Sequence, residues 1–118
     1  MAGNSFDTEP SASASSGLSA ALQRLWEKFL PEIAHRVRVV EEAVNAVETG
    51  RLTAELSADA HQAAHKLAGT LGTFGHAQGS QDALALEAAF DSPTCVRNPS
   101  ELRALVMGLQ RIVHPDGQ

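Results

Sequence analysis

The sequence of 118 residues is poor in aromatic side chains, with no Tyr, one Trp and four Phe. Sheet proteins favour aromatic and β-branched residues, so a core made mostly of Ala, Leu and Val favours closely packed helices. An excess of positive charge is also absent, because the formal net charge is −5 at pH 7. Phosphate backbones are bound by basic surfaces, and this charge balance therefore argues against nucleic acid as the main partner.

A single cysteine, Cys95, excludes an intramolecular disulfide and any metal site built from several cysteines. An unpaired thiol is typical of a reducing cytoplasm. No apolar run approaches the roughly 18 residues that a membrane-spanning helix needs. The N-terminus lacks the basic and apolar regions of a secretory signal. We therefore expect a cytoplasmic protein that does not enter a membrane.

Residues 1–17, MAGNSFDTEPSASASSG, are low in complexity and rich in Ser and Ala. Such a segment buries too little apolar area to offset the entropy lost on ordering. We expect a flexible tail over residues 1–17 and one helical domain over residues 18–115.

Apolar residues recur at helical spacing along the rest of the chain. The spacing predicts a short helix from Leu18 that ends at Pro31, and longer helices over residues 31–49, 57–75 and about 78–90. A last helix is predicted to start at Asn98, since Asn caps helices and the following proline suits the first helical position. Short connections favour antiparallel neighbours. The predicted fold is all-α, an antiparallel up-down four-helix bundle with a short preceding N-terminal helix.

Each of the four longer helices has one apolar stripe that we expect to be buried. The stripes are Ile33, Val37, Val40, Val44 and Val47; Ala60, Ala64, Leu67, Leu71 and Phe74; Ala83, Leu86 and Phe90; and Leu102, Leu105, Leu109 and Ile112.

The helix over residues 57–75 has an unusual polar face. At about 100° per residue, His65 points away from Leu67 and hence from the core. Residues three, four and seven positions from a helical residue share its face; here they are His61, Gln62, Ala68, Gly69 and Gly72. Each glycine inside a helix costs roughly 1 kcal/mol relative to Ala. A partner that lands on this flat face would explain the glycines, whereas a helix that frays after Leu67 would place them in a loop.

An exposed histidine beside a flat patch suits two kinds of chemistry. A neutral imidazole can attack a phosphoryl group carried by a docked partner. Alternatively, His61 and His65 stand four residues apart, which is a workable spacing for two metal ligands. The metal-binding reading is less favoured, because the run between them lacks the glutamate of HExxH and no third ligand is apparent nearby.

The run from Ala64 to Gly75, AHKLAGTLGTFG, resembles the signature of histidine phosphotransfer (HPt) domains. That signature is a histidine followed by an apolar residue two positions on, Gly at four and often seven, an apolar residue at nine and Gly at ten. Here these positions are His65, Leu67, Gly69, Gly72, Phe74 and Gly75. The resemblance implies that His65 accepts a phosphoryl group on Nε2. It also implies that Glu87 accepts a hydrogen bond from the Nδ1–H of His65 and so orients the ring.

The sequence departs from the family pattern at one position. The family usually has Lys or Arg three residues after the histidine, and this chain has Ala68. Lys66 is the adjacent cation; it points about 100° aside, and its long stem makes it a candidate phosphate contact. We expect the partner to supply most of the phosphoryl stabilisation.

The resemblance implies a phosphorelay carrier in two-component signalling rather than an enzyme with its own kinase activity. The expected partner is a response-regulator receiver domain that docks over Ala68, Gly69 and Gly72, and a hybrid histidine kinase is a second candidate. No cofactor is expected on this chain, since Mg²⁺ would come with the receiver and the sequence has no GxxxxGK[ST] loop for ATP. We expect a monomer, because each helix has one apolar stripe. The alternatives are a module that docks a receiver without phosphotransfer and a bundle that binds metal or dimerises.

Overall fold

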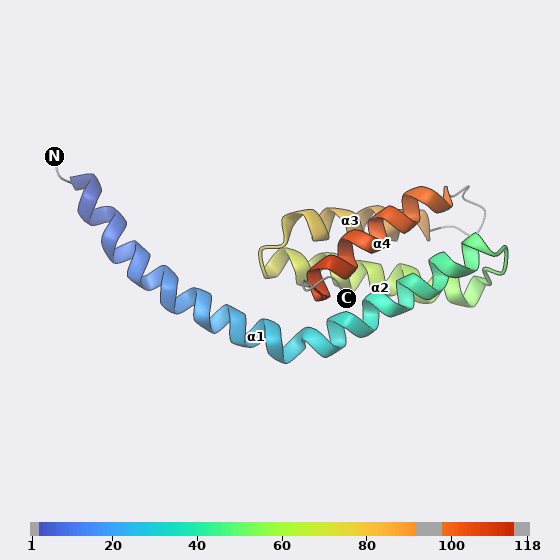
Figure 1. The fold of residues 1–118 in the computed structure, drawn as a ribbon, viewed down its shortest axis with the longest axis horizontal. Coiled ribbons are helices and arrows are strands. Elements are labelled where there is room, and N and C mark those ends of the chain that lie inside the picture. The colour runs from blue at the N-terminus through green and yellow to red at the C-terminus, as the bar shows by residue number, and fades with distance from the viewer. Residues whose placement is uncertain (1–2, 92–97, 115–118) are drawn as a thin grey trace. The chain divides into compact units, whose positions relative to one another are not determined.

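The computed structural model describes the backbone of residues 3–91 and 98–114, and side chains from residue 19 onward within these ranges. Four helices account for most of these residues: α1 (Gly3–Glu48), α2 (Ala54–Thr73), α3 (Ala77–Ala89) and α4 (Pro99–Val113) (Figure 1). Neither described range contains a strand. The all-α prediction is therefore confirmed, while Cys95 lies outside the described residues.

Helix α1 differs from the prediction at both of its expected boundaries. The chain is already helical from Gly3, where we expected a flexible tail, and the helix passes through Pro31 instead of ending there. Extending an existing helix is much easier than starting one, which favours helix in the Ser- and Ala-containing segment. Pro31 removes one backbone donor, but the apolar spacing continues beyond it with Ile33 and Val37, and the burial of these residues maintains the helix.

The chain divides into two compact units, residues 1–30 and residues 31–118. In the first unit, Leu22, Leu25 and Phe29 are 40–44% exposed. The second unit contains the rest of α1 together with α2, α3 and α4, and it holds the hydrophobic core.

The core follows the predicted stripes closely. Thirteen of the seventeen predicted positions are buried, and the side chains of the other four are half-buried: Val47, Phe74, Leu105 and Ile112. Small or β-branched residues complete the core; these are Ala43, Ala46, Ala63, Ala68, Val106 and Val113.

Neighbouring helices run antiparallel. Between α2 and α3, the Ser80 hydroxyl donates a hydrogen bond to the Ala68 carbonyl. Near the other end of α2, the Ser57 hydroxyl donates a hydrogen bond to the Phe90 carbonyl. Between α3 and α4, a Cβ added at Gly79 would clash with Ile112 Cδ1. The start of α3 therefore lies against the end of α4.

Capping groups explain where the helices begin and end. The Thr53 side chain accepts a hydrogen bond from the Leu56 amide at 3.0 Å, and α2 therefore begins at Ala54. This start is three residues before Ser57, where the sequence predicted it, and Ser57 is buried. Gly75, at φ +85°, ends α2 as predicted, and the amide of His76 donates to the Leu71 carbonyl in a Schellman arrangement. Gly50, at φ +69°, closes α1 in the same way.

The predicted start of α4 is also confirmed. The Asn98 side chain accepts hydrogen bonds from the amides of Ser100 and Glu101, and Pro99 occupies the first turn. An asparagine cap satisfies donors that the helix itself leaves unpaired.

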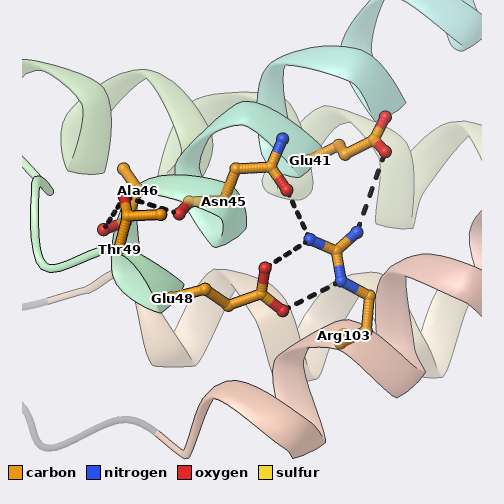
Figure 2. A network of polar contacts seen from close by, with 6 residues as sticks. All are labelled: Glu41, Asn45, Ala46, Glu48, Thr49 and Arg103. Atoms are coloured by element: carbon orange, nitrogen blue, oxygen red, sulfur yellow. Dashed lines mark hydrogen bonds and ion pairs between the residues drawn. The ribbon is translucent and has the colours of Figure 1, made fainter.

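Arg103 ties α4 to α1 (Figure 2). Its guanidinium binds both carboxylate oxygens of Glu48, at 3.0 and 2.8 Å, and also contacts Asn45 and Glu41. The hydrogen bond from Arg103 holds the pKa of Glu48 below its ordinary value of 4.5. A bidentate pair of this kind has a more specific geometry than a single contact.

We predict that Glu48→Gln destabilises the protein at neutral pH but not in acid. Because the pKa of Glu48 is lowered in the folded state, its contribution is fully present above the unfolded pKa. The contribution disappears as the pH falls through the folded value. Urea unfolding of both proteins between pH 7 and about pH 3 measures this difference. Exposed Glu42→Gln is the control; a stability gap for Glu48→Gln that persists unchanged into acid would contradict the prediction.

Candidate functional site

His65 lies in the middle of α2 with its side chain 71% exposed. Its Nδ1 is 3.0 Å from Oε2 of Glu87, which comes from α3 and is 21% exposed. A carboxylate can only accept hydrogen bonds, so this contact favours the ring form that has its proton on Nδ1. The Nε2 atom of that form keeps a free lone pair.

His61 makes a second contact with the same glutamate. Its Nδ1 lies 3.0 Å from the Glu87 backbone carbonyl, and its Nε2 lies 4.0 Å from Oε2. Glu87 is in the last turn of α3, where carbonyls have no partner within the helix, so the imidazole supplies one. His61 was predicted to bind a partner, but the structure places it against α3, where it fixes the backbone of Glu87.

Small groups allow α2 and α3 to pack closely beside the histidines. The Ser80 hydroxyl donates to the Ala68 carbonyl at 2.8 Å, and a Cβ at Gly72 would lie 3.4 Å from the same hydroxyl oxygen. Ala68 is only 6% exposed. The expectation that Ala68 lies on the exposed landing face is therefore wrong, since its position on α2 turns it toward α3.

Gly69 is exposed and has no packing reason to be glycine. A Cβ added there would meet no atom within 4 Å. The exposed residues around His65 are thus Gln62, Lys66, Gly69 and Gly72, which together with His65 we call the His65 face.

An open depression lies on one side of His65. It is lined by His65, Lys66, Gly69, Thr70 and Thr73 from α2 and by Arg36 from α1. Sequence reasoning did not identify Arg36, because no motif marks an arginine that approaches from a different helix. Arg36 also pairs with Glu32, one turn earlier on α1, at 2.6 Å.

The described residues hold no group of three or more His, Cys, Asp or Glu that could bind a metal ion. Both His61 and His65 direct Nδ1 at Glu87, one to the carbonyl and the other to the carboxylate. The arrangement therefore presents an exposed, oriented imidazole next to an anion, with cations at the rim of the depression.

A family model described as Hpt domain matches residues 24–114. The chain belongs to the Hpt domain family. Hpt domains are phosphotransfer carriers rather than kinases, act in phosphorelays of two-component signalling and interact with response-regulator receiver domains. Comparisons with curated proteins and with solved structures gave no significant match.

The match covers α2, α3 and α4 completely, and therefore both His65 and Glu87 of the Hpt domain. Within the described ranges, no helix is long and apolar enough to cross a membrane.

We predict unequal effects for two glycine substitutions in this Hpt domain. Gly69→Ala should stabilise the protein by about 0.5–1 kcal/mol, because alanine favours helix and the added methyl group meets open space. Gly79→Ala should stabilise it less than Gly69→Ala does, because the Cδ1 ends of Ile112 and Leu71 must shift to admit the new Cβ. Urea unfolding measures both; a destabilised Gly69→Ala protein would show that this glycine serves the fold.

Proposed function

We propose that this Hpt domain accepts a phosphoryl group on Nε2 of His65 from the phospho-aspartate of a receiver domain and donates it to another. The observation that best supports this role is the 3.0 Å contact between Nδ1 of His65 and the Glu87 carboxylate. It leaves Nε2 unprotonated on an exposed side chain, which a partner's active site can approach.

In the proposed transfer, the Nε2 lone pair forms a bond to phosphorus while the bond from phosphorus to the aspartate oxygen breaks. The aspartate leaves as a carboxylate, and the proton stays on Nδ1. Positive charge develops on the imidazole ring as the new bond forms, and the Glu87 carboxylate stabilises that charge. The remaining barrier is lowered mainly by positioning.

The divalent cation in this proposal belongs to the receiver. Mg²⁺ bound there would neutralise charge on the phosphoryl oxygens during the transfer. The Hpt domain itself contributes the nucleophile, its orienting carboxylate and the flat surface around Gly69.

We predict that phosphorylated receiver domains with Mg²⁺ transfer one phosphoryl group to the wild-type protein. Intact-mass analysis would detect an acid-labile gain of one phosphoryl group, which His65→Gln abolishes. Glu87→Gln should slow the transfer about tenfold, since hydrogen bonds to charged groups contribute about 1.5–3 kcal/mol and this one is partly exposed to water.

Glu42→Gln removes an exposed carboxylate elsewhere on α1 and is the matched control for Glu87→Gln. Phosphorylation that persists in His65→Gln would contradict the assignment of the acceptor. Equal rates for Glu87→Gln and Glu42→Gln would contradict the role of Glu87.

We predict that Gly69→Arg folds normally but blocks receiver docking. A Cβ at residue 69 meets no atom within 4 Å, so the arginine side chain can extend outward from α2, where a docked partner would collide with it. Binding of the receiver and the rate of transfer should both fall at least tenfold relative to Gly69→Ala. Normal transfer by Gly69→Arg would show that the partner docks elsewhere.

Ala68, in place of the usual basic residue, favours one alternative, a module that docks a receiver without accepting phosphate. If receiver domains bind but none of the phosphorylated receivers tested increases the mass of the protein, this alternative is supported and the carrier role is excluded.

A further inference from the structure

The depression beside His65 brings together cations from two helices. Lys66 follows His65 directly on α2, and Arg36 approaches from α1. Both line the same open space as the imidazole, and Gly69 keeps that space free of side-chain atoms. A phosphoryl group on His65 carries close to two negative charges near neutral pH, and oxygens that extend into this space would meet positive charge.

Arg36 is well suited to bind such a group. A guanidinium offers several N–H donors in a planar fork that matches two phosphate oxygens, whereas an ammonium acts as a point charge. Arg36 is currently paired with Glu32 at 2.6 Å, and Glu32 is largely exposed. Exposed pairs of this kind contribute little to stability, so the guanidinium can exchange Glu32 for a more highly charged acceptor.

We propose that Arg36 binds the phosphoryl group of phosphorylated His65, with Lys66 beside it, and so supplies from α1 the cation that position 68 lacks. This inference rests on the proposed function of His65. It assigns a phosphate-binding role to a residue outside the helix of the acceptor histidine. Glu32 then competes with the phosphoryl group for the guanidinium, because it pairs with Arg36 while His65 is unmodified.

The test uses the full chain and phosphoramidate, a small donor whose P–N bond breaks as the bond between phosphorus and Nε2 forms, with release of ammonia. Phosphorus NMR would follow the signal that is present in the wild-type protein and absent in His65→Gln. Arg36→Gln should lower the initial rate about two- to fivefold, the factor that corresponds to an exposed charge pair. It should also shift the phosphorus resonance of the modified His65.

Arg38→Gln is the matched control, because it removes the same charge two residues away on the exposed surface of α1. It should leave both the rate and the resonance at their wild-type values. Arg36→Lys should restore most of the rate, since it keeps the charge. Equal behaviour of Arg36→Gln and Arg38→Gln would overturn the inference.

Glu32→Gln separates binding of phosphate from a structural role of the ion pair. This variant breaks the pair but frees Arg36, so it should raise the initial rate. A lowered rate like that of Arg36→Gln would show that the pair acts through structure and would overturn the inference. The proposed function has its own test: if phosphoramidate modifies His65 but no receiver does, the carrier role fails while the assignment of Arg36 is still decided by these variants.

Discussion

The close packing of α2 against α3 is the constraint on which the site depends. His65 and Glu87 are 22 residues apart in sequence, and a contact of 3.0 Å joins Nδ1 to the carboxylate only if the two helix axes stay close. The hydrogen bond from Ser80 to the Ala68 carbonyl fixes that approach one turn from His65, and the missing side chain of Gly72 leaves room for it.

Opposite charges lie on different sides of the His65 imidazole ring. An anion faces Nδ1, and cations border the open side of the ring, where phosphoryl oxygens would lie in the proposed phosphorylated protein. His61 helps to hold Glu87 in this place, because its Nδ1 contacts the Glu87 backbone carbonyl and its Nε2 lies near the Glu87 carboxylate. An exposed side chain is thus oriented by groups that are less exposed than itself.

The sequence predicted the parts of this arrangement that depend on local rules. Helical spacing located the buried stripes, and Gly75 and Asn98 marked helix ends through backbone conformation and capping. The partnership of His65 with Glu87 came from family resemblance, since spacing within one helix says nothing about a residue on another. Arg36 was missed for the same reason.

Two other expectations failed for tertiary reasons. The helical wheel treats all residues on one side of His65 as exposed, but α3 covers part of that side and buries Ala68. Pro31 was expected to stop the helix because of its missing N–H, yet the burial of Ile33 and Val37 beyond it outweighs the loss of one hydrogen bond.

Helix α4 differs from the other three helices in its position relative to His65. Among the described residues, those gathered around His65 come from α1, α2 and α3, while α4 is fastened to α1 through Arg103 and to α3 through Ile112 at Gly79. Met107 on α4 is 47% exposed and is not among the residues that line the depression beside His65. A fluorescent reporter or an immobilising tether attached at Met107 would leave His65 and the residues around it unaltered.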